Sequence, residues 1–467
     1  MAPFSALFLA ASAVGASAFA VARSEGGSAN SPISVPLYQD VRIKPVRRLR
    51  KRDDDTSAEI LNMTSTSYLI ELDLGSPAQT VKVALDTGSS ELWVNPNCAT
   101  SGNGAQERIC DDHGHYSPSR SDTSQISQTQ NTITYGKGEV QLRYVADTIK
   151  VPGTDINLDT VIFGYGLDSV DLTTGILGLS FGEGINTPYA TVVDELADQN
   201  VTKTRAFSIA LGKKNEPTGT GVISFGGIDT KKFSGDLHTM PVLGQLYGEN
   251  ISRYWVQLES IGIDIVNGPS QTYSNSSFPV FFDTGATLSY LPESIIQDMA
   301  RDLNGEYDDQ IALYTVPCNA QGTFDFTFDG YTIKVDYEEF IWDAGVDVCV
   351  LGADATNDNS YILGDSFLRS VYTVYDLETP ALHFAPYANC GSNPQMIPGG
   401  KNATTQFSGE CAEGATGGGN SGSTGTNSGG GNGGTPNDNG NGAGQLSPSS
   451  WVWAVGLVVG AQALPSI

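Results

Sequence analysis

The chain has 467 residues, 39% of them hydrophobic, which is enough for two domains of ordinary size, each with its own core. Its formal net charge of −27 argues against nucleic acid or an anionic membrane surface as a partner. Glycine is abundant, but the excess lies at the C-terminal end, so the middle of the chain has an ordinary globular composition.

The N-terminal residues are typical of a secreted precursor. Residues 1–20 combine a short apolar run with the small-residue site Ala18-Phe19-Ala20, and we expect a signal peptide there. Residues 21–52 contain eight Lys or Arg and two acids, a net charge of +6 on a chain whose remainder carries −33. We expect this basic pro-segment to cover an acidic active site. Cleavage is expected after the dibasic pair Lys51-Arg52, so the uncleaved chain would be an inactive precursor.

The N-terminal lobe, expected over residues 53–238, begins with two strand patterns. Tyr68 to Leu72 and Val81 to Val83 alternate apolar and polar residues, with a turn at Gly75-Ser76-Pro77. The second pattern continues into an apolar run that stops at Asp86-Thr87-Gly88. Because an apolar run indicates a buried strand and glycine marks a close turn, the sequence places the Asp86 carboxylate at a strand tip.

Two more elements are predicted in this lobe. Thr132 to Val140 contains Tyr-Gly-Lys-Gly between β-forming residues and predicts a hairpin. A helix is predicted from Pro188 to Asn200, with Thr187 as its N-cap.

The C-terminal lobe, expected over residues 239–395, repeats the plan. A second apolar run stops at Asp283-Thr284-Gly285 and places another carboxylate at a strand tip. A helix from Pro292 to Leu303 follows, and then a hairpin from Phe324 to Val335.

Each Asp-Thr-Gly is followed by an apolar-apolar-Gly sequence, Ile176-Leu177-Gly178 in the first half and Ile362-Leu363-Gly364 in the second. The matched order indicates an internal duplication. If the halves pack about a pseudo-two-fold axis, Asp86 and Asp283 face each other and share one proton. One carboxyl would then act as a base on water and the other as an acid on a peptide carbonyl.

These motifs resemble those of the pepsin-type aspartic endopeptidases, nearest to the fungal yapsin and candidapepsin-like group, over roughly residues 65–390. The resemblance implies an all-β, bilobal double β-barrel with a few short helices and an active-site cleft between the lobes. It makes Asp86 and Asp283 the catalytic pair, with Gly88 and Gly285 in their turns, and it implies no metal or organic cofactor. Proteins or peptides would be the substrates, and a monomer is expected.

The hairpin at Thr132 to Val140 is similar to the flap of this family, which closes over substrate. On this match Tyr135 is the flap tyrosine and Trp93 is the residue that positions it. Relatives that prefer basic side chains often have an acid at the flap position that Lys137 occupies, so Lys137 weakens that specificity for this chain. Glu91 or Glu107 could still supply such a preference.

The two halves differ after the Asp-Thr-Gly motif. The Ser89 hydroxyl can hydrogen-bond to Asp86, but Ala286 stands where many relatives have Ser or Thr. A carboxylate that lacks a hydrogen bond is less stabilised when charged, so its pKa should be higher. We therefore expect a less acidic optimum than an Ala286→Thr variant would show.

An even number of cysteines behind a secretory start predicts disulfides. Neighbour pairing gives Cys98–Cys110, Cys318–Cys349 and Cys390–Cys411. The first two match loops that the family often closes, whereas the sequence leaves the third open. The segment Cys110 to His115 also contains metal-ligand residue types, but a disulfide competes for its cysteine.

The C-terminal end changes in composition. Residues 396–444 are rich in Gly, Ser and Asn and are expected to form a flexible stalk. Residues 445–467 end in an apolar stretch that fits a glycosylphosphatidylinositol (GPI) signal, with attachment at Asn441. A single-pass tail anchor is the alternative. Five Asn-x-Ser/Thr sites support a glycosylated surface: Asn62, Asn200, Asn250, Asn275 and Asn402.

The sequence therefore predicts an aspartic endopeptidase that is made as a zymogen and is tethered at the outer cell surface or in the wall. A non-catalytic surface glycoprotein on the same fold is the alternative. A third reading starts from Gly178-Leu179-Ser180-Phe181-Gly182, which matches the Gly-x-Ser-x-Gly pattern of serine hydrolases. His238 and His383 lie downstream, but no Gly-rich oxyanion segment precedes Ser180, and the lobe repeat accounts for the same residues.

Overall fold

A computed structural model of the chain describes residues 33–36, 38–39, 60–61, 67–136, 138–216, 221–266, 268, 270–345, 348–356 and 359–414. Several predicted features lie outside these residues: the signal peptide, the cleavage site at Arg52, Asn62, Lys137, most of the stalk and Asn441. No helix in the described part of the chain is long and apolar enough to cross a membrane.

The first half of the chain folds around a nine-stranded sheet that a pairing of β4 with β8 closes into a barrel. Its strands, in spatial order, are β3 (Ile60–Leu61), β2 (Tyr38–Gln39), β4 (Leu69–Leu74), β5 (Gln79–Asp86), β10 (Gly175–Gly178), β6 (Leu92–Val94), β9 (Asn157–Val170), β8 (Glu139–Lys150) and β7 (Gln125–Thr134). The strands β4 and β5 were predicted from their alternation, and alternate side chains of both are buried.

The second half is built from three smaller sheets. The first contains β16 (Trp255–Leu258), β19 (Phe278–Phe282), β28 (Ile362–Leu363), β20 (Ser289–Pro292) and β27 (Ala353–Thr356). The second contains β18 (Ser270–Thr272), β17 (Ser260–Ile265), β23 (Gly322–Phe328) and β24 (Tyr331–Asp336), and the last two strands confirm the predicted hairpin. The third contains β21 (Glu306–Asp308), β22 (Leu313–Val316), β26 (Val348–Val350) and β25 (Trp342–Gly345).

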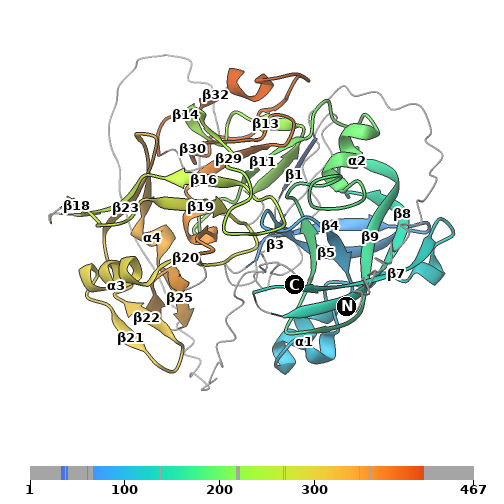
Figure 1. Ribbon diagram of the computed structural model, residues 1–467, viewed down its shortest axis with the longest axis horizontal. Coiled ribbons are helices and arrows are strands. Elements are labelled where there is room, and N and C mark those ends of the chain that lie inside the picture. Colours follow the sequence, from blue (N-terminus) through green and yellow to red (C-terminus); the bar gives the residue numbers. More distant parts are fainter. Residues whose placement is uncertain are drawn as a thin grey trace, which may run out of the picture.

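A six-stranded sheet joins the halves. Its order is β1 (Ile33–Pro36), β12 (Val222–Phe225), β11 (Ala206–Ala210), β29 (Val371–Asp376), β30 (Ala381–Pro386) and β15 (His238–Pro241). Figure 1 shows the first-half barrel and the second-half sheets on opposite sides of the molecule. A single buried apolar cluster includes residues of both halves, so the lobes share a continuous core. The architecture is the predicted all-β, bilobal, pepsin-like fold.

The helices are short: α1 (Gly104–Asp111), α2 (Val192–Asp198), α3 (Glu293–Asp302), α4 (Tyr337–Phe340) and α5 (Asp365–Leu368), with 3-10 turns η1 (Cys98–Thr100), η2 (Pro118–Arg120) and η3 (Ala403–Gln406). The predicted helix Pro292–Leu303 is confirmed as α3, with its flanking residues as caps. The prediction of Pro188–Asn200 was wrong at its start. There Thr191 and Asp194 form a capping box that begins α2 at Val192, and Thr187 instead donates a hydrogen bond to the Tyr189 carbonyl.

Residues after 387 fold back onto the body. Strand β31 (Pro394–Met396) pairs with β13 (Gly227–Asp229), and β32 (Ser408–Glu410) pairs with β14 (Ser234–Asp236). The six cysteines form the three neighbour disulfides: Cys98–Cys110, Cys318–Cys349 and Cys390–Cys411. The third disulfide joins Cys390, in the predicted C-terminal lobe, to Cys411, in the predicted stalk.

Candidate active site

Asp86 and Asp283 stand at the ends of matching strands in the two lobes. Strand β5 ends at Asp86 and runs parallel to β10, with Gly178 opposite Asp86. Strand β19 ends one residue before Asp283 and runs parallel to β28, and the Asp283 amide donates to the Leu363 carbonyl at 3.1 Å. The two apolar-apolar-Gly sequences therefore hold the two strand ends in the same way, as the duplication predicted.

Thr87 and Thr284 join the two Asp-Thr-Gly loops through reciprocal hydrogen bonds. The Thr87 hydroxyl donates to the Phe282 carbonyl at 2.8 Å, and the Thr284 hydroxyl donates to the Leu85 carbonyl at 3.0 Å. Each threonine amide also donates to the hydroxyl of the other threonine, at 3.2 and 3.1 Å. Because these buried bonds connect the backbone of one lobe to that of the other, they fix the position of one loop relative to the other.

The two aspartate side chains are almost fully buried, at 1% exposure for Asp86 and 0% for Asp283. The Gly88 amide donates to Asp86 Oδ1, and the Gly285 amide donates to Asp283 Oδ1, each at 2.8 Å. Each glycine also faces the opposite carboxyl. A Cβ at Gly88 would come within 2.5 Å of Asp283 Oδ2, and one at Gly285 would come within 2.6 Å of Asp86 Oδ1. The close approach of the carboxyls therefore requires glycine at both positions.

The carboxyls differ in their hydrogen bonds. The Ser89 hydroxyl donates to Asp86 Oδ2 at 2.5 Å, whereas Asp283 Oδ2 has no hydrogen-bond partner among the described residues. Burial raises the pKa of both carboxyls, and the charge of Asp86 raises the pKa of Asp283 further, to well above its usual value. Hydrogen bonds from the Ser89 hydroxyl, from Asp283 and from the Gly88 amide oppose the rise of the pKa at Asp86. This asymmetry favours an ionised Asp86 and a protonated Asp283.

Tyr135 and Trp93 are in contact, as the resemblance implied. The Trp93 indole N–H donates to the Tyr135 hydroxyl at 2.6 Å, and both side chains are buried. Strands β7 and β8 form the predicted hairpin, and the Tyr135 amide donates to the Gly138 carbonyl across its turn at 3.0 Å. Gly138 has a φ of +90°, which favours glycine there.

Two charged residues near the site were not placed by the sequence. Glu91 was considered only as a possible contact for substrate, but its Oε2 accepts from the hydroxyls of Tyr144 and Tyr189, both at 2.6 Å. Arg253 precedes β16, and its Nη1 donates to the Gly88 carbonyl in the opposite lobe at 2.5 Å. In the sequence Arg253 stands beside the aromatic residues Tyr254 and Trp255, but this position does not indicate which residue it contacts.

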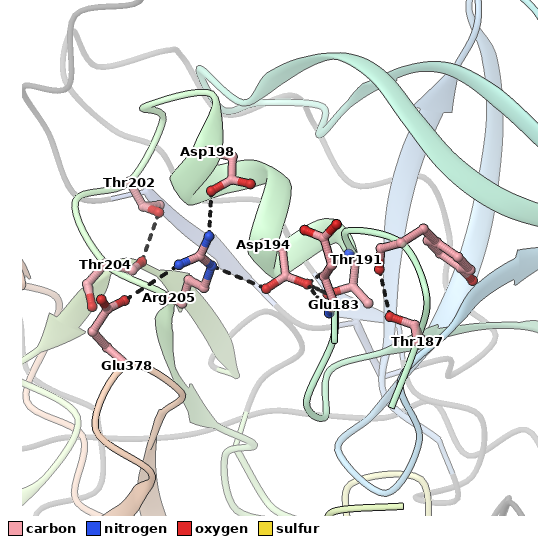
Figure 2. A network of polar contacts seen from close by, with 10 residues as sticks. Glu183, Thr187, Thr191, Asp194, Asp198, Thr202, Thr204, Arg205 and Glu378 are labelled. Atoms are coloured by element: carbon pink, nitrogen blue, oxygen red, sulfur yellow. Dashed lines mark hydrogen bonds and ion pairs between the residues drawn. The ribbon is translucent and has the colours of Figure 1, made fainter. Parts of the chain in front are cut away.

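Ser180 lies in a different setting from that of a hydrolase nucleophile. Its hydroxyl donates to the Ser252 carbonyl at 3.2 Å, and the polar and stacking contacts of His238 and His383 are with other residues. Packing explains the last glycine of the motif, Gly182, because a Cβ there would come within 1.9 Å of Asp194 Oδ2. Figure 2 shows Asp194 at the start of α2, where it accepts from the Thr191 and Glu183 amides and pairs with Arg205.

The segment Cys110 to His115 holds no metal-ligand cluster. Among the described residues, no three His, Cys, Asp or Glu side chains are grouped so that they could hold a metal ion. Cys110 is in a disulfide, and His113 Nδ1 lies 3.1 Å from the Thr173 carbonyl. Burial lowers the pKa of His113 to about 4, as expected of a neutral, packed imidazole.

Comparison with known proteins agrees with this geometry. The family model for eukaryotic aspartyl protease matches residues 67–387. The chain is 30% identical over 375 residues to probable aspartic-type endopeptidase opsB of Aspergillus fumigatus, a match that covers 76% of this chain and 74% of opsB. It is 34% identical over 325 residues to secreted aspartic protease 8 of Candida albicans (68% and 75% covered) and 26% identical over 437 residues to aspartic proteinase 3 of Saccharomyces cerevisiae (76% of both). With two Asp-Thr-Gly loops that bring buried carboxyls together, the chain belongs to the eukaryotic aspartyl protease family.

Proposed function

We propose that this protein is an endopeptidase that hydrolyses internal peptide bonds of proteins and peptides, with Asp86 and Asp283 as its catalytic residues. The observation that carries the proposal is the buried carboxyl pair, one member from each lobe, held in the same backbone frame but differing in pKa. The three relatives, each named as a protease or endopeptidase, support it.

The reaction needs one base and one acid. The Asp86 carboxylate takes a proton from a water molecule as the water oxygen attacks the peptide carbonyl carbon, and Asp283 gives its proton to the carbonyl oxygen. This step forms a neutral tetrahedral diol and leaves the pair with its one proton on Asp86. In the second step Asp86 protonates the amide nitrogen, Asp283 takes a proton from a diol hydroxyl, and the C–N bond breaks. Tyr135 would close the flap over the substrate and exclude water, with Trp93 holding Tyr135 in position.

A digest of a peptide library by the processed protein, with and without pepstatin, tests this function. We expect cleavage that pepstatin blocks and that either Asp86→Asn or Asp283→Asn reduces at least a thousandfold. Asp354→Asn is the matched control, because burial also raises the pKa of Asp354 but this residue lies outside the carboxyl pair. Cleavage that survives in both aspartate variants would contradict the proposal. A folded protein that cleaves no peptide would favour the non-catalytic glycoprotein.

We further propose that residues 21–52 are a pro-segment removed after Arg52. Their net charge of +6 is opposite to that of the remaining chain. Within this segment β1 pairs along its length with β12 in the sheet that joins the lobes. Blocking cleavage with Lys51→Ala and Arg52→Ala together should leave a longer protein of low activity. Full activity of that uncleaved form would rule out an inactive precursor.

The protein is proposed to act outside the cell on a lipid tether. One relative is named a secreted protease, and the asparagines at four sequence sites for N-glycosylation are exposed: Asn200, Asn250, Asn275 and Asn402. GPI attachment is proposed at Asn441, behind a Gly-rich stalk. A phosphatidylinositol-specific phospholipase should release the protein from cells, and retention of the protein after treatment would favour the tail anchor.

A further inference from the structure

Arg253 is a buried arginine that reaches from one lobe to the catalytic loop of the other. It lies just before β16 in the C-terminal lobe, and its residue exposure is 3%. Its Nη1 donates to the Gly88 carbonyl at 2.5 Å, across 165 residues of sequence. Its Nε donates to Glu249 Oε1 at 2.9 Å, and its guanidinium carbon lies 5.0 Å from the ring centroid of Phe281. An arginine with this many fixed contacts has little freedom to turn away.

The contact falls on a peptide unit that the carboxyl pair depends on. The Gly88 amide donates to Asp86 Oδ1, and the next residue, Ser89, donates its hydroxyl to Asp86 Oδ2. Gly88 also lies against Asp283, because a Cβ at this position would come within 2.5 Å of Asp283 Oδ2. Fixing the Gly88 carbonyl therefore fixes the two donors on Asp86 and the distance between Gly88 and Asp283.

The guanidinium also carries a positive charge into a site that is otherwise acidic. It lowers the pKa of Asp86 and of Asp283, against the larger rise that burial causes in each. Four other titratable side chains among the described residues interact with the pair: Tyr135 just after β7, Tyr290 on β20, Tyr375 on β29 and Asp365 on α5. None of these four is cationic, and Glu249 is the anion that faces Arg253 itself.

We propose that Arg253 is a positioning residue for the peptidase reaction, which holds the Gly88–Ser89 peptide from the opposite lobe and supplies the positive charge that allows a buried carboxyl pair to ionise. The proposal rests on the proposed function, since it concerns the same carboxyl pair. The positive charge matters for Asp283 in particular, because Ala286 leaves Asp283 without the hydroxyl that Asp86 receives from Ser89.

The test separates the effect of the Arg253 charge from the effect of its hydrogen bonds, and it uses the enzyme after removal of the pro-segment. Arg253→Gln removes the charge, so both limbs of the pH profile of kcat/KM should move up by about one pH unit. Its kcat should fall about tenfold with a smaller change in KM, because the loss concerns the reacting groups. Arg253→Lys keeps the charge but cannot reproduce the fork of contacts, so its kcat should fall while the limbs stay near their wild-type positions. Glu249→Gln removes the facing anion, so the limbs should move to lower pH.

Arg205→Gln is the matched control. Arg205 also pairs with several acids, Asp194, Asp198 and Glu378 (Figure 2), and neither catalytic carboxyl is among these partners. It should lower the melting temperature and leave the pH profile unchanged. If Arg253→Gln behaves like Arg205→Gln, with lower stability and an unchanged profile, Arg253 is a structural contact only and the proposal is wrong.

If Arg253→Gln does not fold, the pH profiles of Arg253→Lys and Glu249→Gln test the proposal. An unchanged profile in Glu249→Gln, or a rise of the limbs in Arg253→Lys equal to a full loss of charge, would overturn the proposal. Absence of proteolysis in the wild-type enzyme would contradict the proposed function instead, so the two failures are distinguishable.

Discussion

Ser89 and Ala286 occupy the same place in the two Asp-Thr-Gly loops but give the carboxyls different surroundings. Ser89 donates to Asp86 Oδ2, while the side chain of Ala286 is fully buried among apolar residues and donates nothing. A hydrogen bond to a carboxylate stabilises the charged form and lowers its pKa. We therefore expect the residue after the motif to favour Asp86 as the base and Asp283 as the acid.

Ser89→Ala should shift the acid limb of the pH profile upward. The variant removes a donor to the charged form of Asp86, so the pKa of Asp86 rises and more alkaline conditions are needed to ionise it. A hydrogen bond to a charged group contributes about 1.5–3 kcal/mol, and one pKa unit corresponds to about 1.4 kcal/mol, so we expect a shift of about one to two units. The profile of kcat/KM against pH measures it, and an unmoved acid limb would show that the hydroxyl does not support the carboxylate.

Ala286→Thr should move the alkaline limb of the pH profile to lower pH. A hydroxyl there would donate to the Asp283 carboxylate, lower the pKa of Asp283, and cause activity to be lost at a lower pH on the alkaline side. Because Ala286 is fully buried, the smaller Ala286→Ser is a control that needs less space. Alkaline limbs that coincide in the wild type and both variants would refute the expectation.

Among the elements, the turn end of the β7–β8 hairpin is joined to β6 by a buried hydrogen bond between Tyr135 and Trp93. Tyr135→Phe removes the acceptor of the Trp93 indole N–H, which is buried and would be left unpaired. An unpaired buried donor costs about 1–3 kcal/mol, so kcat/KM should fall about tenfold.

A double-mutant cycle with Trp93→Phe checks this assignment. The two single losses should not add, because each removes the same bond, and the exposed Tyr247→Phe should leave kcat/KM unchanged. Additive losses would mean that Tyr135 and Trp93 act separately.

For the whole molecule, buried carboxyls set the pH dependence of stability. Among the described residues, burial raises the pKa values of four nearly fully buried carboxyls, Asp86, Asp283, Glu339 and Asp365, and of the partly buried Glu71 and Asp354. From the ordinary value of about 4 upward, the folded state therefore binds more protons than the unfolded chain, and the free energy of unfolding falls as the pH rises. In the described part of the chain, the two carboxyls with lowered pKa, Asp264 and Glu410, act in the opposite direction, but solvent screens their charges.

We therefore expect a higher melting temperature at pH 4–5 than at pH 7. The net charge of −27 adds repulsion at neutral pH and acts in the same direction. Asp365→Asn should flatten this dependence and raise the melting temperature at pH 7, because neither Asp365 oxygen has a hydrogen-bond partner among the described residues. Calorimetry from pH 4 to 8 measures both effects. A melting temperature that rises toward pH 7 would show that paired carboxylates dominate instead.

The local structure around the site could be predicted because it depends on neighbours in sequence. Apolar runs that stop at Asp-Thr-Gly became strand ends, and the hairpins at Thr132–Val140 and Phe324–Val335 formed where alternation and glycine placed them. The start of α2 was misplaced because Thr187-Pro188 and Thr191-Val192 are both acceptable helix starts. Asp194, whose carboxylate packs against Gly182 and pairs with Arg205, decided between them.

The sequence by itself determined the two carboxylates, their turns and the duplicated frame, because motif spacing and hydrophobic period are properties of the linear sequence. Only the tertiary structure decided that Thr87 and Thr284 bond across 197 residues, that Asp283 Oδ2 lacks a partner among the residues that the structure describes, and that Arg253 reaches Gly88. Burial and charge act through distance in space, and a linear pattern does not contain the distance between residues of different lobes.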